Sequence, residues 1–199
     1  MNYLFQLLSA VVIGGIVIVL FNFISAFTAT ILGDDTPKNN GQLSLNPIKH
    51  IEPFGFILFV LIGYGWSNMI ETRPSNFKDR KKGTILTYSM PIIVSILLAI
   101  VINSLAKFIP NPVVGGNHSL AALYLIPSMF AHTLLQFALI NIIPVYPLFG
   151  SNVLKACLKP NTAMSYTQKE RIIQIIILFL MFLGINVAPI DAIVNLILG

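Results

Sequence analysis

The sequence contains few charged residues. Of its 199 residues, 10% are charged and 56% are hydrophobic, whereas a soluble domain carries about a quarter charged residues. This is too little charge to cover a folded chain with a hydrated surface, which excludes an ordinary soluble protein. We therefore expect a single integral membrane domain that comprises residues 1–199.

Cysteine is also nearly absent. Cys157 is the one cysteine, so no disulfide can form within the chain and cysteine usage indicates no redox compartment. The chain has no internal repeat and no low-complexity segment. Its formal net charge is +5, but the basic residues lie in loops between apolar runs. That placement is typical of membrane topology, and we expect no nucleic-acid partner.

Long apolar runs take the place of charge. A helix needs roughly 20 apolar residues to cross a bilayer, and five runs approach or exceed that length. They are residues 3–32, 54–66, 85–106, 120–143 and 172–198. Only helices satisfy backbone polar groups in lipid without closing a barrel, and no short alternating pattern is present. We therefore expect an all-α integral membrane protein with about five to six transmembrane helices.

Two of these runs carry local signals. The second run, residues 54–66, is short and contains Gly55, Gly63 and Gly65, so it predicts either a short tilted span or a re-entrant segment. Pro189 is expected to break the last run, with Asp191 capping the helix that follows. Whether the second run crosses the membrane is left open by the sequence.

The loop charges predict an orientation. With five alternating spans, the basic loops at residues 67–83 and 146–171 lie on one side, which the positive-inside rule assigns to the cytoplasm. The N-terminus would share that side. Many Ile and Asn residues are typical of an AT-rich genome, which favours a bacterial cell membrane as the location.

Three polar segments interrupt the apolar runs in a particular order. Residues 33–55 contain GDDTP, GQLSLNP and HIEPFG, and residues 75–91 contain SNFK, a basic cluster and MP. Residues 141–151 read NIIPVYPLFGS. In order and spacing, these segments resemble the motifs of the small site-2 proteases, which are intramembrane zinc metalloproteases. The resemblance covers about residues 20–155 and implies a site-2-protease-like core.

The resemblance also implies where the chemistry of that family would lie. A His-Glu-x-x-His helix supplies two zinc ligands and a general base, and the Asp of a Pro-Leu-Asp-Gly motif supplies a third ligand. Counting back from Gly33 without a gap places Phe21 and Ser25 at the histidine positions and Asn22 at the glutamate position. Phe149 occupies the aspartate position.

These replacements predict a pseudoprotease without metal or cofactor. A catalytic zinc needs about three N, O or S ligands, which Phe21 and Phe149 cannot offer, and Asn22 and Ser25 are poor neutral ligands. Without a metal, nothing lowers the pKa of a water molecule, and no base is positioned to activate it. We expect the rings of Phe21, Phe23 and Phe149 to fill the former zinc cavity.

The remaining candidates for chemistry have simpler interpretations. Of the three histidines, His50 resembles a structural loop residue of the family, and His118 lies in a glycine-containing loop where solvation is expected. His132 lies inside an apolar run, where an ionisable residue is a candidate functional site, although an interhelical hydrogen bond is the simpler interpretation. Serine chemistry would need a base beside Ser25 or Ser151, and the sequence shows no such pair.

A fold that keeps its loops after losing its metal favours a binding function. The resemblance implies a short membrane-associated hairpin or loop near residues 36–53 that presents substrate, with residues 141–150 as the opposite wall. The expected groove residues are Asn46, Pro47, His50, Asn141, Pro144 and Pro147. We expect an adaptor, regulator or subunit of a membrane complex, which lies in the lipid bilayer and binds another membrane protein or a transmembrane or extended peptide, the last by strand addition.

Two alternatives belong to other functional classes. One is an active intramembrane protease with an atypical site, in which Ser25 or His132 would be essential. The other is a small transporter or channel component. A transporter would need polar groups lining its spans, and this sequence has few of them.

Overall fold

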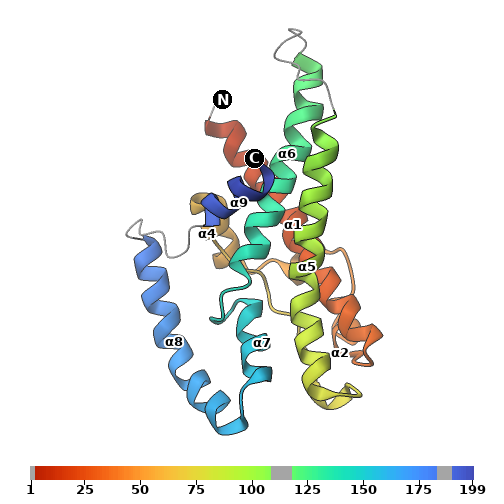
Figure 1. Ribbon diagram of the computed structural model, residues 1–199, viewed down its shortest axis with the longest axis vertical. Helices are drawn as coiled ribbons and strands as arrows, with labels where there is room; N and C mark the ends of the chain where they lie inside the picture. The colour runs from red at the N-terminus through yellow and green to blue at the C-terminus, as the bar shows by residue number, and fades with distance from the viewer. Residues whose placement is uncertain (1–2, 109–117, 183–189) are drawn as a thin grey trace.

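The computed structural model describes residues 3–108, 118–182 and 190–199, and every regular element in these ranges is a helix. The long helices are α1 (Tyr3–Ile31), α5 (Arg80–Ala106), α6 (His118–Ile140) and α8 (Pro160–Phe182) (Figure 1). The short elements are α2 (Thr36–Asn39), α3 (Pro47–His50), α4 (Pro53–Ile62), the 3-10 turn η1 (Pro74–Asn76), α7 (Phe149–Cys157) and α9 (Ile190–Leu198). The all-α prediction is confirmed for the described residues.

Two of the described helices are long and apolar enough to cross a membrane, namely Leu7–Ile31 within α1 and the whole of α5. The apolar helices Pro53–Ile62 and Leu125–Ile140 are shorter. The outer face of α5 exposes Ile93, Leu97, Val101 and Leu105, and their spacing of four residues places them on one side of the helix. Such an apolar outer face is typical of a helix surrounded by lipid. Further spans, up to the expected five to six, stay a prediction.

α1, α5 and α6 form the centre of the bundle. α5 packs against both α1 and α6, α7 lies on α5, and α4 and α9 pack against α1 and α6 respectively. The core that these helices share includes the fully buried side chains of Val17, Ile18, Leu134 and Phe137. By contrast, α8 packs only against α7 among the described elements, and Figure 1 shows it standing apart from the bundle.

Residues 53–73 leave one end of the bundle and return to it. α4 has 10 residues, which span about 15 Å or roughly half of the hydrocarbon core of a bilayer. Gly63, with φ of 78°, ends α4 in the left-handed conformation that glycine adopts readily. A Cβ on Gly65 would lie 2.1 Å from the carbonyl oxygen of Gly55, so the returning segment lies directly against α4. This geometry favours the re-entrant alternative for the second apolar run.

Asp34, which follows α1, binds the segment that leads into α5. Its buried carboxylate accepts hydrogen bonds from the Arg73 backbone N–H at 2.6 Å and from the Asn76 side chain at 2.8 Å. Its own turn is closed by the hydroxyl of Thr36 at 2.6 Å. Because Asp34 follows α1 and Arg73 precedes α5, α1 ends at the same end of the molecule where α5 begins.

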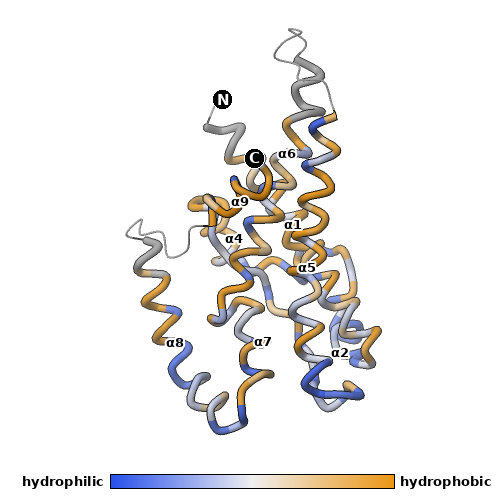
Figure 2. The backbone as a smooth tube through the Cα atoms, viewed as in Figure 1, coloured by the Kyte–Doolittle hydropathy of each residue, from blue (hydrophilic) through white to orange (hydrophobic). Residues whose placement is uncertain are grey.

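This connection differs from the expected alternation of spans, which counted a full crossing between residues 54 and 66. With a re-entrant segment there, the first residues of α1 lie at the end of the bundle opposite to the start of α5 (Figure 1). Figure 2 shows hydrophilic residues at the start of α5 and at the connection of α7 to α8, both at one end of the molecule. The assignment of that end to the cytoplasm stays a prediction.

The last apolar run is divided between α8 and α9. The expected break at Pro189 falls within residues 183–189, which lie outside the described residues. Asp191 lies in the first turn of α9 and not at its cap, and its carboxylate accepts hydrogen bonds from the hydroxyl of Tyr64 at 3.1 Å and the amide of Gln136 at 3.4 Å. Asp191 therefore connects α9 to α6 and to the segment that returns from α4.

Candidate functional site

The four positions that the resemblance assigns to zinc chemistry lie at the centre of the bundle. Phe21 and Phe149 are both fully buried, and their ring centroids are 5.0 Å apart. Phe21 also meets Phe137 edge to face at 5.1 Å, and Phe149 meets Tyr88 in the same way at 5.3 Å. Edge-to-face ring pairs are favourable beyond the apolar area that they bury. Aromatic rings from α1, α5, α6 and α7 thus fill the space between these helices.

Phe23 does not belong to this ring cluster. It is half-buried and stacks on Phe27 at 6.2 Å, on a different face of α1. The expectation that Phe23 helps to fill the former zinc cavity is therefore wrong, because a helix places residues 21 and 23 on faces about 200° apart.

Asn22 uses its side-chain amide to hold two other segments. The amide nitrogen donates to the carbonyl oxygens of Asn68 at 2.8 Å and His50 at 3.3 Å, and the amide oxygen accepts from the hydroxyl of Ser67 at 3.0 Å. Asn22 is fully buried. Both polar atoms are therefore bound within the protein, and the side chain fastens α1 to the end of α3 and to the returning segment.

Ser25 is bound in a comparable way. Its hydroxyl donates to the backbone carbonyl of Thr87 on α5 at 2.9 Å. In a regular helix that carbonyl would accept from residue 91, but Pro91 has no N–H. Ser25 therefore supplies to the Thr87 carbonyl the donor that Pro91 lacks.

The geometry of these positions matches a metal site, but the side chains do not. Phe21 and Ser25 lie one helical turn apart on α1, and Phe149 faces Phe21 from α7, which is the arrangement that two helix ligands and a third opposite ligand require. The rings are in contact, and Asn22 and Ser25 are already bound to protein groups. In the described ranges no three His, Cys, Asp or Glu side chains gather where they could hold a metal ion. The residues at this place do not fit a zinc ion.

The expected groove residues are divided between two places. Asn46 and Pro47 are exposed at the start of α3, where Pro47 and Leu45 line a shallow apolar groove against α1. The Asn46 side chain caps α3 by accepting from the Ile48 N–H at 3.1 Å. Residues 36–53 form α2, α3 and turns, with no strand in this segment.

The second wall lies at the connection of α6 to α7. Asn141 is buried, and its side chain accepts from the Phe149 N–H at 3.3 Å while its carbonyl accepts from Gly150 at 2.8 Å. Pro147, after a cis peptide bond, lines an apolar cavity on the side of α8, whereas Pro144 is exposed and its carbonyl accepts from the hydroxyl of Tyr166. Pro47 and Pro147 thus line different hollows.

His50 is fully buried at the end of α3. Its Nε2 donates to the Ser44 carbonyl at 2.6 Å, which leaves Nδ1 unprotonated and without a partner. Burial lowers the pKa of the imidazole, although the hydrogen bond to Ser44 opposes that shift. The loop hydrogen bond expected for His50 is present. His132 is half-buried in α6, and the side chain of His118 lies outside the described part of the structure.

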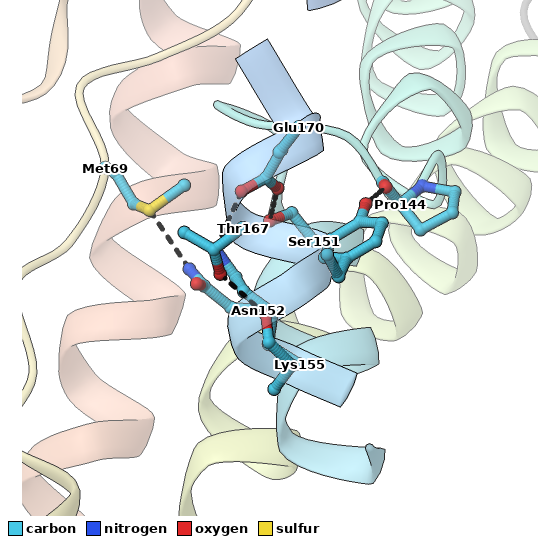
Figure 3. A network of polar contacts seen from close by, with 9 residues as sticks. Met69, Pro144, Ser151, Asn152, Lys155, Thr167 and Glu170 are labelled. Atoms are coloured by element: carbon cyan, nitrogen blue, oxygen red, sulfur yellow. Dashed lines mark hydrogen bonds and ion pairs between the residues drawn. The ribbon is translucent and has the colours of Figure 1, made fainter. Parts of the chain in front are cut away.

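Sequence reasoning missed a buried polar cluster between α7 and α8. Figure 3 shows the carboxylate of Glu170 bound by the Ser151 hydroxyl and by the ammonium group of Lys155, the latter at 3.3 Å. Glu170 is 3% exposed and Ser151 is fully buried. Ser151 and Lys155 lie one turn apart on α7, but 19 residues separate Ser151 from Glu170 on α8. The sequence therefore did not indicate that these side chains meet. We name Ser151, Lys155, Tyr166 and Glu170 the α7–α8 clasp.

The clasp brings a carboxylate to Ser151, which the sequence did not indicate. A serine nucleophile must reach a substrate and needs a base that takes its proton. Ser151 has no exposed surface, and the carboxylate that it contacts is also paired with Lys155. The arrangement therefore fits a connection between helices better than a nucleophile.

Comparison with known proteins places the chain in a family. No family model matches the sequence, and no solved structure matches it significantly. The putative zinc metalloprotease YwhC of Bacillus subtilis (strain 168) is 32% identical over 166 residues, which cover 80% of this chain and 74% of the relative. The chain belongs to the family of this metalloprotease, which agrees with the site-2-protease-like motifs of its sequence.

Proposed function

We propose that the chain is a non-catalytic member of its family, a pseudoprotease that acts as an adaptor, regulator or subunit in a membrane complex. This proposal rests on the side chains that occupy the positions of the zinc ligands. Phe21 and Phe149 pack ring against ring at 5.0 Å, and Asn22 and Ser25 hold neighbouring segments together. Each position has an apolar or structural function that would have to be given up before a metal could enter.

The proposed location is a bacterial cell membrane. The apolar helices Leu7–Ile31 and Arg80–Ala106 and the exposed apolar face of α5 support it. The hydrophilic end of the molecule, where α5 begins, would face the cytoplasm because it carries the basic residues Lys78, Arg80, Lys81 and Lys82.

The partner proposed is another membrane protein or a transmembrane peptide. The exposed groove along α1, lined by Val12, Ile16, Leu45 and Pro47, offers an apolar surface for it. Strand addition finds less support. The returning segment is already held by two side chains. The amide of Gln42 donates to the Met69 carbonyl at 3.3 Å and accepts from the Glu71 N–H at 3.0 Å. The hydroxyl of Tyr88 donates to the Ile70 carbonyl.

A restoration experiment tests the loss of the metal site. The combined substitutions Phe21→His, Asn22→Glu, Ser25→His and Phe149→Asp should allow uptake of about one zinc per chain, because they place two ligands one turn apart on α1 and a third on α7. The wild-type protein, purified in detergent, should contain no stoichiometric zinc by elemental analysis. A matched control that carries Phe149→Asn in place of Phe149→Asp should bind zinc more weakly.

Proteolysis by the wild-type chain would contradict the proposal. We would incubate the purified protein with a transmembrane model peptide in detergent and look for cleavage products by mass spectrometry. The variants Ser25→Ala, His132→Ala and Ser151→Ala are measured beside it. Cleavage by the wild type that any of these variants abolishes would establish an atypical active site, whereas the pseudoprotease predicts no cleavage in any sample.

A further inference from the structure

A second hollow lies away from the zinc positions. It is an apolar cavity of ≈ 550 Å³ bounded by α4, by residues 64–66, by the connection of α6 to α7, and by α8. Leu58, Trp66, Pro147 and Ile177 are among its lining residues, and Gln174 on α8 is its most polar contact. Among the described residues, α8 is held to the bundle at its lower half, by the α7–α8 clasp, and the cavity lies beside its upper half.

The upper half of α8 therefore has two apolar sides. Ile177 and Phe179 line the cavity, while Ile172, Ile175 and Ile176 are exposed on the helix surface. Gln174 is the main polar side chain of a lining that is otherwise almost entirely apolar, so water would find few hydrogen-bond partners in the cavity. In a membrane, an apolar group is the favoured occupant.

The cavity lies between α4 and α8, and its lining is almost entirely apolar. A single acyl chain, which is much narrower than a helix with its side chains, can enter such a space. The charge at the rim of the cavity distinguishes the candidate occupants.

The lower rim of the cavity carries positive charge. Arg171 lies three residues before Gln174 on α8, so helix geometry places it on the same face, one turn below the cavity. Arg171 and Lys169 are exposed, and neither takes part in the ion pairs of the described residues, since Glu170 is paired with Lys155. Figure 2 shows that α8 changes from hydrophilic to hydrophobic just above this point, at the level where a lipid headgroup would lie.

We propose that the cavity between α4 and α8 binds one acyl chain of an anionic phospholipid, with the phosphate at Arg171. An apolar slot that ends at a cationic rim is complementary to a lipid chain that ends at a phosphate, and an anionic headgroup adds a charge that the exposed Arg171 attracts. This proposal requires only that the chain lies in a membrane, and it holds whether or not the chain is a protease.

Trp66 provides the measurement, because it is the only tryptophan of the chain and it lines the cavity. We would titrate the full-length protein in detergent with phosphatidylglycerol whose acyl chains carry bromine atoms, and record the quenching of tryptophan fluorescence. Quenching should saturate at about one lipid per protein. Brominated phosphatidylcholine, which has the same chains and no net charge, should need higher concentrations for the same quenching.

Two pairs of variants sharpen the test. Ile177→Phe places a larger side chain in the cavity and should reduce the quenching at saturation at least twofold, whereas Ile175→Phe on the exposed face of α8 should not. Arg171→Gln should raise the phosphatidylglycerol concentration for half-quenching about fivefold and that of phosphatidylcholine less, because choline compensates the charge of its phosphate. Lys38→Gln removes an exposed charge on α2, far from α8 (Figure 1), and serves as its control.

Three results would overturn the proposal. Quenching that rises without saturation and equally in both isoleucine variants would mean that Trp66 meets only bulk lipid. Equal affinity for the two headgroups in the wild type would remove the role of Arg171. Absence of quenching at every lipid concentration would mean that a protein segment, such as a partner helix or α8 itself, closes the cavity.

Discussion

The hydroxyl of Ser25 donates a 2.9 Å hydrogen bond to the backbone carbonyl of Thr87, and this carbonyl is the one that Pro91 leaves without its helical donor. Both residues are fully buried at the contact of α1 with α5. A buried carbonyl without a donor is costly in a membrane bundle, where no water replaces the missing partner. The serine at a metal-ligand position thus has a defined structural task.

The relation between Ser25 and Pro91 gives a double-mutant cycle. Ser25→Ala should lower the free energy of unfolding by about 1–2 kcal/mol, because Thr87 loses its donor. In the background of Pro91→Ala, residue 91 supplies the helical N–H, and the same substitution should cost less than about 0.5 kcal/mol. Unfolding in detergent micelles by a denaturing surfactant measures both values. Equal costs in the two backgrounds would show that Ser25 does not compensate for the proline.

Much of this site could be predicted from the sequence. Counting back from Gly33 without a gap placed Phe21 at a ligand position, and the motif in residues 141–151 placed Phe149 at another. The structure finds the rings of these two residues in contact. The hydrogen bond of Ser25 could not be predicted, because it depends on which turn of α5 faces α1. Local patterns specify the face of a helix but not its axial register against a neighbour.

The ring cluster predicts a large stability effect at Phe149. Phe149→Ala should lower the free energy of unfolding by about 3–5 kcal/mol, since it removes ring contacts with Phe21 and Tyr88 from the middle of the bundle. Phe108→Ala, at a phenylalanine that is 85% exposed, should change it by less than about 0.5 kcal/mol. Thermal unfolding in detergent, followed by circular dichroism, compares the two. Similar effects of both variants would contradict the packing described for Phe149.

Asp34 predicts a dependence of stability on pH. Burial by itself raises the pKa of this carboxyl, but hydrogen bonds from Thr36, Arg73 and Asn76 hold it below the ordinary value. A carboxyl whose pKa is lower in the folded state stabilises the fold above its unfolded pKa of about 3.9, and that contribution is lost as the pH falls through the folded pKa.

Thermal unfolding across the acidic range tests this effect. The wild type should lose stability on acidification below about pH 4, and Asp34→Asn should be less stable at neutral pH but show a smaller loss below it. Asp35→Asn removes the neighbouring exposed carboxylate, which makes no capping hydrogen bond, and should behave like the wild type. A wild-type midpoint that does not change on acidification would show that Asp34 makes no such contribution.

The connection of residues 33–36 to residues 73–76 marks a limit of sequence reasoning. The shortness of the second apolar run and its glycines left a re-entrant segment open, but the expected orientation counted that run as a full crossing. The hydrogen bond between Asp34 and Arg73 spans 39 residues, and no local pattern encodes such a pair. Long-range polar contacts of this kind, together with the α7–α8 clasp, account for what the sequence could not show.

The clasp predicts a change in the position of α8. Glu170→Ala removes the shared acceptor of Ser151 and Lys155, which leaves the hydrogen bond of Tyr166 to Pro144 as the remaining side-chain bond of the clasp. The native, exposed Cys157 at the end of α7 accepts one spin label, and Ile175→Cys on the exposed face of α8 accepts the second. The distance distribution between the labels should broaden in Glu170→Ala.

Lys159→Ala, which removes an exposed charge near the same turn, should leave the distribution of label distances unchanged. The combination of Glu170→Leu and Lys155→Met tests whether charge is needed at all, because a well-packed apolar pair can replace a buried ion pair without loss of stability. We expect a narrow distribution in that variant, since the hydroxyl of Ser151 can turn to a backbone carbonyl of its own helix. If Glu170→Ala gives the same narrow distribution as the wild type, apolar packing and not the clasp holds α8 in place.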